Sequence, residues 1–137
     1  MKKGSPMLKG SCHCGAADWQ FDVWPDGATL CNCTICRRYG VLWIYGHDGE
    51  DTHLNGITQV YKADAGWLEF RFCPGCGCLL AWRSVLSKED GRRRMAVNLR
   101  LSEDQQIIRS IPLDLFDGLE TFKNLPRDGR TVADLLL

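Results

Sequence analysis

The sequence predicts a mostly β protein, and three observations carry this prediction. Apolar residues alternate with polar ones in several short runs, as they do in strands that bury one face. Glycine, proline and aspartate separate these runs in the manner of tight turns. Only the stretch from Ser102 to about Arg109 carries helix signals, an N-cap serine followed by two acidic residues. We therefore expect a sheet protein with one short helical turn.

The amino-terminal part of the chain contains the first expected strands. Residues 8–24 form a pair of strands with a turn at 12–15, and the apolar side chains that alternate beyond this turn are Ala17, Trp19, Phe21 and Val23. The turn signal at 25–27 precedes a strand over 28–33. Residues 41–47 are apolar, aromatic and β-branched, which favours another strand. The polar stretch 47–56 is expected to be a loop.

The second half of the chain repeats this pattern. Residues 57–63 and 67–73 form two strands separated by Asp64-Ala65-Gly66, and Leu68 and Phe70 share a face with Phe72. Strands over 79–83 and 95–101 flank a charged loop at 84–94. Pro112 ends the helical turn, and residues 116–118 close that region. The tail 121–137 is expected to pack on the domain or on a partner subunit.

Several side chains within these elements are assigned by their position. Trp19, Trp67 and Trp82 fall in alternating strand patterns and are expected in the core. Trp43 and Tyr45 either line a pocket or pack between strands. For Asn98 and Asp117 we expect backbone capping or loop closure.

The length and the charge of the chain limit the classes of protein to which it can belong. The 137 residues suit one domain over 1–137, without a linker that would divide it. Basic and acidic residues balance at 17 each, which argues against non-specific nucleic-acid binding, and the longest apolar run, 41–45, is far shorter than a membrane helix of about 20 residues. The first residues lack the apolar run of a signal peptide, so we expect a cytoplasmic protein. The oligomeric state is open.

Eight cysteines in such a compartment favour metal ligands over disulfides. Cys73-Pro74-Gly75-Cys76 has the pattern of a zinc knuckle and needs two further ligands, which Cys12 and Cys14 provide most economically. We expect these four cysteines to hold a closed, structural zinc that staples the short strands together. Cys78 is a spare thiol, either a small residue beside the knuckle or a further ligand.

The densest cysteine group is Cys31, Cys33 and Cys36, followed directly by two arginines. Three thiols so close in sequence can converge on one metal but leave its fourth position open, which is typical of a working zinc site. The histidines at 13, 47 and 53 are conceivable fourth ligands, although each is more simply an exposed side chain. The sequence therefore predicts a second, labile zinc.

Five segments together resemble the family of glutathione-dependent formaldehyde-activating enzymes. They are residues 10–15, 31–37, 72–77, 97–100 and 116–118, within a motif-bearing region of about 8–120. The resemblance implies a β-tent fold of short antiparallel strands, a structural zinc on Cys12, Cys14, Cys73 and Cys76, and a catalytic zinc on Cys31, Cys33 and Cys36. Many members have a small polar residue where this chain has Cys78.

The resemblance also implies a carbon–sulfur lyase or synthase that acts on glutathione and formaldehyde, or on a related thiol–aldehyde adduct. Three thiolates make zinc a weak Lewis acid for water but suit it to thiol exchange. Arg37 is expected to hold a glutathione carboxylate, whereas Arg38 is more simply a solvated charge. Two other hypotheses remain, a non-catalytic zinc module that binds another protein and a thiol-based zinc or redox sensor.

Overall fold

The computed structural model describes residues 7–62 and 66–137, whose strands form two sheets, so the predicted mostly β class is confirmed. The smaller sheet has the order β1-β2-β5 and consists of β1 (Leu8–Ser11), β2 (Ala17–Phe21) and β5 (Thr52–Gly56). The larger sheet has the order β11-β10-β3-β4-β9-β8-β7-β6. Its strands are β3 (Ala28–Cys31), β4 (Trp43–His47), β6 (Gln59–Lys62), β7 (Leu68–Phe72), β8 (Leu79–Ser84), β9 (Arg94–Asn98), β10 (Leu113–Asp117) and β11 (Lys123–Leu125).

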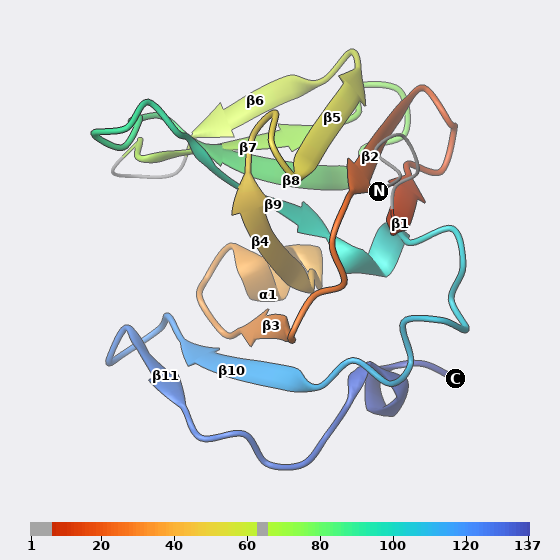
Figure 1. The fold of residues 1–137 in the computed structure, drawn as a ribbon, viewed down its shortest axis with the longest axis vertical. Helices are drawn as coiled ribbons and strands as arrows, with labels where there is room; N and C mark the ends of the chain where they lie inside the picture. The colour runs from red at the N-terminus through yellow and green to blue at the C-terminus, as the bar shows by residue number, and fades with distance from the viewer. Residues whose placement is uncertain (1–6, 63–65) are drawn as a thin grey trace.

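Helical structure among the described residues is limited to three single turns. They are α1 (Cys36–Tyr39), η1 (Leu99–Leu101) and η2 (Val132–Leu135). In Figure 1, α1 and β3 lie between β4 and the blue β10–β11 hairpin. The end of the molecule that carries the β1–β2 hairpin is opposite to the end formed by β10 and β11 (Figure 1).

One strand pair departs from the antiparallel arrangement implied by the family resemblance. β10 runs parallel to β3, with Leu113 opposite Ala28 and Phe116 opposite Cys31. A parallel pair needs a long crossover connection, and here β4 to β9 and the turns after η1 supply it. The pairing brings residues from position 113 onward beside the three-cysteine segment.

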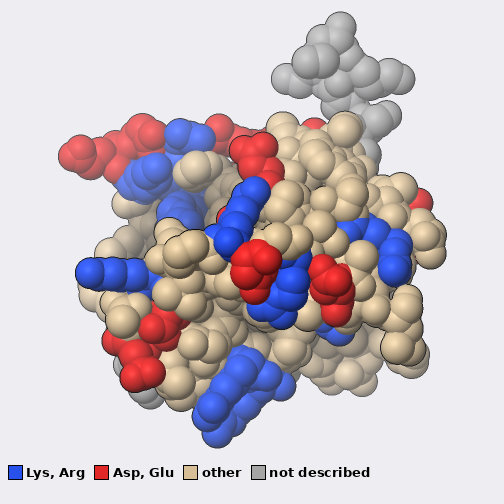
Figure 2. All heavy atoms as spheres, turned by 90° about the horizontal axis from the view of Figure 1, so that it is seen from below, with Lys and Arg blue, Asp and Glu red and all other residues tan. Residues whose placement is uncertain are grey.

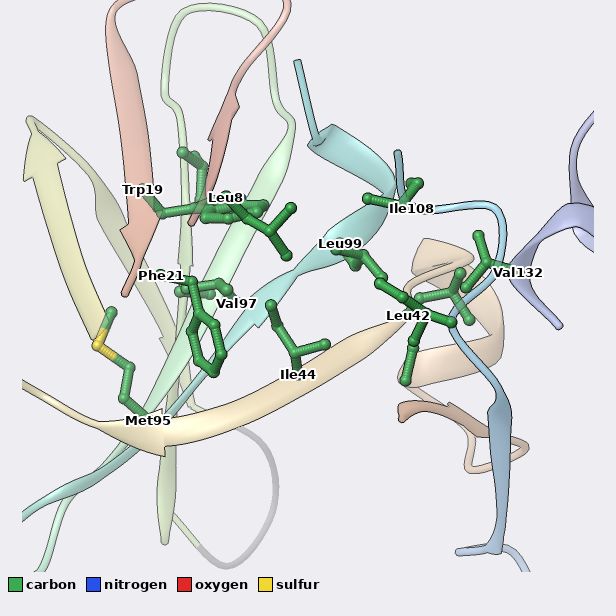
Figure 3. Packing of buried hydrophobic residues seen from close by; sticks show 14 of the residues in the cluster. Leu8, Trp19, Phe21, Leu42, Ile44, Met95, Val97, Leu99, Ile108 and Val132 are labelled. Atoms are coloured by element: carbon green, nitrogen blue, oxygen red, sulfur yellow. The ribbon is translucent and has the colours of Figure 1, made fainter. Parts of the chain in front are cut away.

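The main core fills the space between the two sheets. Leu8 and the alternating residues Trp19 and Phe21 point from the smaller sheet toward Ile44 and Met95 of the larger one (Figure 3). Trp19 is fully buried, and its indole lies against Gly10, where a Cβ would have no room. The alternation read from the sequence is therefore correct through Phe21, but Val23 lies beyond the strand and is exposed.

A buried asparagine joins three segments beneath this core. Asn98 accepts hydrogen bonds through Oδ1 from the backbone N–H groups of Leu42 (3.3 Å) and Arg100 (3.2 Å), and its Nδ2 donates to the carbonyl of Leu79 (2.9 Å). These bonds close the start of η1 and hold it to β8 and to the segment before β4. The expected capping role of Asn98 is confirmed.

Two secondary-structure predictions are wrong. Residues 52–56 form strand β5 rather than a loop, because they pair along the whole length of β2 and bury Thr52. Residues 102–109 do not form a helix: turns begin only at Gln105, and Ser102, the expected N-cap, instead pairs with Gly10 in an isolated bridge while its hydroxyl donates to the carbonyl of Asp104 (3.2 Å). The carboxylate of Asp104 instead caps the next turn by accepting from the N–H groups of Gln106 and Ile107.

Two further predictions concern single segments. Trp67 is 58% exposed and does not belong to the core, because it precedes β7 instead of lying within it. The tail packs on the domain: β11 pairs with β10, and η2 begins with a capping box between Thr131 and Asp134 and buries Val132 against Leu42 and Ile108 (Figure 3). The expected turn at Asp64 and Ala65, together with Ala63, lies outside the described residues.

Within residues 7–62 and 66–137, no helix has the length and apolar character needed to cross a membrane. The balanced charge of the chain appears on the surface as neighbouring acidic and basic side chains (Figure 2). Arg127 pairs with Asp114 at 2.7 Å and Arg130 with Asp128 at 2.9 Å. Such exposed pairs contribute little to stability, so the fold depends mainly on the core and on the cysteine clusters described below.

Candidate metal centres and an aromatic cavity

Four cysteine sulfurs from two turns meet at one point. Cys12 and Cys14 lie in the turn between β1 and β2, and Cys73 and Cys76 lie in the turn between β7 and β8. All four sulfurs lie within 4.8 Å of one another, with Cys12 and Cys14 3.7 Å apart and Cys14 and Cys73 3.5 Å apart. A tetrahedral zinc with bonds of about 2.3 Å requires sulfurs about 3.8 Å apart. The donor set and its spacing fit a closed zinc site.

Backbone N–H groups point at these sulfurs. Ala17 donates to Cys12 Sγ at 3.4 Å and Gly75 donates to Cys73 Sγ at 3.3 Å. Hydrogen bonds from Cys78 and Cys14 backbone N–H groups lower the pKa of Cys76 to about 5. Hydrogen bonds that favour the thiolate prepare a thiol for a metal, since zinc binds the deprotonated form.

The second cluster contains the remaining predicted ligands and, among the residues that the structure describes, has three members. Cys31 ends β3, Cys33 follows in the loop, and Cys36 begins α1. Their sulfurs also lie within 4.8 Å of one another. The short helix ends at Gly40 in the left-handed conformation (φ 66°), and this returns the chain at once to β4. The end of β3, the loop and the start of α1 therefore bring the three thiols toward a common centre.

Each sulfur of the three-cysteine cluster accepts a hydrogen bond from a neighbouring N–H group. The N–H of Cys33 donates to Cys31 Sγ (3.4 Å), the N–H of Cys36 donates to Cys33 Sγ (3.3 Å), and the indole Nε1 of Trp43 donates to Cys36 Sγ (3.3 Å). The indole donor comes from β4 and is itself buried. These bonds withdraw charge from the sulfurs and fix their orientation.

Hydrogen bonding within the three-cysteine cluster shifts the pKa values of Cys31 and Cys36 in opposite directions. A hydrogen bond from the Cys36 thiol, followed in size by opposing desolvation and by the N–H of Cys33, lowers the pKa of Cys31 to about 6. The same hydrogen bond raises the pKa of Cys36 well above its ordinary value. Of these two cysteines, Cys31 is therefore the one that favours the thiolate, which is the form that binds a metal or acts as a nucleophile.

The C-terminal segment closes over this cluster from β10. The backbone of Gly118 lies so near Cys31 that a Cβ added there would be 2.8 Å from its sulfur. The next contact is polar: Asn32 Nδ2 donates to Asp117 Oδ1 at 3.1 Å, and Asn32 Oδ1 accepts from the N–H of Leu119 at 3.0 Å. The expected loop-closing role of Asp117 is confirmed.

The three-cysteine cluster forms part of the wall of a cavity of about 730 Å³. This volume lies within the range of small-molecule sites. Most of its wall is aromatic or aliphatic, and the only charged side chain among the described lining residues is that of Arg94. The aromatic lining residues are Trp43, Tyr45, Trp67, Phe70, Trp82, Phe116 and Phe122. Trp43 and Tyr45 thus line a pocket, one of the two alternatives left open by the sequence.

Other candidate residues from the sequence lie apart from this cavity. Arg37 lines a smaller hollow of about 450 Å³, which touches Cys31 and Cys36 from another side and also includes Arg130. Cys78 belongs to neither cluster; its carbonyl accepts from the N–H of Cys73 at 2.9 Å, and its side chain packs against the core. Neither cluster includes a histidine: Nδ1 of His47 meets Arg92 and Nε2 of His53 meets Asp22.

Sequence reasoning missed several residues of the cavity. Arg94 stood in a run of three arginines and gave no sign that it differs from Arg92, which pairs with Glu50 at 2.7 Å. Phe116 and Phe122 follow the last cysteine by about 40 residues and enter the site only through the β10–β3 pairing. The motif at 116–118 was the single available sign that this segment approaches the cysteines.

The fold and the two sets of cysteine sulfurs define a mostly β protein with two clusters suited to zinc. The family model of the glutathione-dependent formaldehyde-activating enzyme matches residues 7–110, so the chain belongs to this family. The resemblance seen in the sequence is confirmed. Residues 111–137, which include two aromatic walls of the cavity, lie outside the matched segment.

A structural comparison agrees on the fold. A crystal structure of a Rhodobacter sphaeroides protein from a structural genomics programme superposes with a TM-score of 0.58 at 21% sequence identity. The superposition covers 77% of this chain and 98% of that one. No curated protein sequence matches the chain significantly.

Proposed function

We propose that the chain is a zinc-dependent carbon–sulfur lyase or synthase that joins a small thiol to an aldehyde. Its substrates are glutathione and formaldehyde, or a related small thiol and its aldehyde adduct. The observation that carries the proposal is the position of the three-cysteine cluster in the wall of a cavity large enough for a small molecule. A cluster that only stabilised the fold would be expected to have four ligands and no adjoining cavity. Family membership supports the same reaction class.

Two zinc ions with different roles follow from this proposal. Cys12, Cys14, Cys73 and Cys76 would hold the structural ion, and Cys31, Cys33 and Cys36 would hold the labile one. Zinc at the second cluster would supply a site at which a substrate thiol is kept as its thiolate. A protein that depends on the reduced cysteines of both clusters suits the cytoplasm, which is where we place it.

The reaction is redox-neutral and needs no further reactant. The substrate sulfur donates an electron pair to the carbonyl carbon of formaldehyde, the C–S bond forms, and the C=O electron pair moves to oxygen, which takes up the proton lost by the thiol. The protein contributes mainly by holding both reactants together in a cavity with largely aromatic walls. Proximity of this kind contributes several kcal/mol, at most about 7–11, to lowering a bimolecular barrier.

Arg37 remains our candidate for binding a glutathione carboxylate. It lies at the second hollow beside Arg130, and both hollows share Cys31 and Cys36. The guanidinium of Arg37 suits a carboxylate there, because its fork can donate two parallel hydrogen bonds, whereas Arg130 already pairs with Asp128. Replacement of Arg37 by alanine should weaken glutathione binding without loss of zinc.

The test combines zinc stoichiometry with exchange kinetics. We expect two zinc ions per chain, and we expect the wild-type protein to accelerate interconversion of glutathione and S-hydroxymethylglutathione above the spontaneous rate, as measured by two-dimensional exchange NMR. Cys33→Ser should remain folded with one zinc and lose the acceleration. Cys78→Ser, which changes a thiol outside both clusters, is the matched control and should behave as wild type.

One observation favours a second candidate, a zinc module that binds another protein. β6 is an edge strand with every residue exposed, including Val60 and Tyr61. Such an edge can accept a strand from a partner. One tightly held zinc and no response to glutathione would favour this candidate and remove the enzyme. Zinc release by peroxide at low dose would instead favour a redox sensor.

A further inference from the structure

The lining of the large cavity is much less polar than glutathione. Glutathione is a polar peptide with two carboxylates and an ammonium group, and its body has no ring. The described part of the cavity wall is built from seven aromatic side chains together with Ile35 and Leu68. Among these described lining residues, Thr29 and Asn124 are the only neutral polar side chains other than the thiols and Tyr45. A ligand that covers this aromatic surface is favoured when its body is apolar and planar, because a charged peptide would lose hydration there without compensation.

Arg94 gives this apolar cavity a single cation. Its guanidinium Cζ lies 5.5 Å from the ring centroid of Tyr45 and 5.6 Å from that of Trp82. The two rings, themselves 6.0 Å apart, hold the guanidinium by cation–π contacts and leave its N–H donors available. In the described ranges 7–62 and 66–137, no carboxylate pairs with Arg94, in contrast to Arg92 and Arg83. A ligand carboxylate is the partner that such a group fits best.

The sheet register sets the separation between the cation and the thiols. Arg94 stands opposite His47 in the β4–β9 ladder, and Trp43, whose indole touches Cys36, stands opposite Asn98. Four residues of strand span about 13 Å. The side chain of Arg94 extends from its position opposite His47 back over Tyr45 and Trp82. The distance that a ligand must span between the guanidinium and the thiols is therefore shorter than this strand length.

Part of the aromatic wall comes from the C-terminal segment, which the family model does not cover. Phe116 and Phe122 pack edge to face with centroids 5.0 Å apart, and both lie beyond the residues matched by the family model. The backbone of Phe122 has a positive φ of 55°, which residues other than glycine rarely adopt. Its N–H donates to the carbonyl of Asp117 at 2.7 Å, which keeps the ring at the cavity. These two rings therefore add to the aromatic surface that a ligand in the cavity would contact.

We infer that the cavity binds an aromatic thiol, or its aldehyde adduct, that carries one carboxylate at the end opposite to the sulfur. The aryl body lies among the aromatic walls, Arg94 receives the carboxylate, and the sulfur meets the three-cysteine cluster. Only the position of the sulfur rests on the proposed function; the aryl and carboxylate contacts depend on the cavity alone. Arg94 is thus the residue that determines specificity.

Four probes separate these contacts. 4-(Sulfanylmethyl)benzoate has the thiol, the ring and the carboxylate; phenylmethanethiol lacks the carboxylate; 6-sulfanylhexanoate lacks the ring; and 4-methylbenzoate lacks the thiol. Their affinities and that of glutathione are measured by calorimetry on the zinc-loaded full-length chain. We expect 4-(sulfanylmethyl)benzoate to bind most tightly, and each deletion to weaken binding.

Variants assign the carboxylate to Arg94. Arg94→Met should weaken binding of both benzoates by about 10- to 100-fold, the size expected for a charge-assisted hydrogen-bonded contact, and leave phenylmethanethiol unchanged. Arg94→Lys should recover part of the loss. Arg93→Met is the matched control, because Arg93 is the neighbouring arginine and does not line the cavity. Circular dichroism and zinc content confirm that each variant is folded.

The outcomes distinguish this inference from the proposed function. Cobalt substituted at the second cluster reports thiol ligation by its charge-transfer absorption, independently of the calorimetry. If thiols change this absorption but glutathione binds as tightly as 4-(sulfanylmethyl)benzoate, or if Arg93→Met weakens binding as much as Arg94→Met, the inference is overturned and the proposed function stands. If no thiol changes the absorption while 4-methylbenzoate binding depends on Arg94, the proposed function fails and the cavity assignment stands.

Discussion

A single carboxylate, that of Asp117, ties the C-terminal turn to the three-cysteine segment. Its Oδ1 accepts from Asn32 Nδ2 at 3.1 Å and its Oδ2 accepts from the hydroxyl of Thr121 at 2.9 Å, with further bonds from backbone N–H groups of the same turn. Foremost the bond from Asn32, and then those from Thr121, lower the pKa of Asp117 from 3.8 to about 2. The carboxylate form is therefore the one that closes the turn.

This depressed pKa predicts how stability depends on pH. Because the folded-state pKa lies below the unfolded value, the contribution of Asp117 is fully present above about pH 4 and is lost as the pH falls through about 2. Asp117→Asn should therefore be less stable than wild type at neutral pH, and the difference should shrink below pH 4. The difference in free energy of unfolding, measured by denaturant titration from pH 7 to pH 2, cancels effects of metal loss common to both proteins. A difference that stays constant over this range would show that the carboxylate charge has no part in the contact.

At the scale of elements, the pairing of β10 with β3 positions the second cluster. It places Gly118 directly after β10 against Cys31 and Cys33. A Cβ at Gly118 would lie 2.8 Å from Cys31 Sγ, closer than real Cβ atoms approach, and 3.0 Å from Cys33 Cβ, which is a tight contact. Glycine is required here for space, since its φ is not positive.

Gly118→Ala should consequently disturb the second cluster and spare the first. We expect a loss of about 1–3 kcal/mol from overpacking and a weaker hold on the second metal, measured by competition of zinc with a chromogenic chelator. Gly75→Ala is the control, because its Cβ would meet Cys14 and Cys73 sulfurs at 3.6 and 3.7 Å, which is ordinary contact. Equal zinc loss in both variants would contradict a specific role for the close approach at Gly118.

The element scale also shows what the sequence alone predicts and what it leaves out. Local patterns located most strands, because alternation and turn residues act within a few positions, and Ala17, Trp19 and Phe21 are buried as expected. β5 was missed because its partner β2, rather than its own polar sequence, makes it a strand. Trp67 was misplaced because alternation does not tell where a strand begins.

The sequence also defined the two cysteine groups, because ligand spacing is a local property, but not the cavity beside them. Its wall combines β4, β7, β8 and the segment after β10 with the strand end at Arg94. The sheet order and register that bring these segments together depend on long-range pairing, for which single residues carry no sign. The proposed substrate therefore depends on the structure more than the proposed metal sites do.

At the scale of the whole molecule, the four-cysteine cluster connects the two sheets. One pair of its sulfurs comes from the β1–β2 turn of the smaller sheet and the other pair from the β7–β8 turn of the larger one. Structural zinc contributes about 10–16 kcal/mol of apparent binding energy, which is comparable to the entire net stability of a domain, about 5–15 kcal/mol. A zinc at this cluster would thus determine whether the sheets remain packed.

The two clusters should accordingly respond differently to metal removal. We expect a chelator titration to release zinc in two steps, the first from the three-cysteine cluster without loss of near-ultraviolet circular dichroism, and the second together with unfolding. Cys73→Ser should fail to fold or melt far below wild type, because Cys73 is buried within the four-cysteine cluster. Cys33→Ser should show only the second step. Should Cys73→Ser retain wild-type stability while Cys33→Ser unfolds, the assignment of structural and labile roles would have to be reversed, and with it the position of the reactive site.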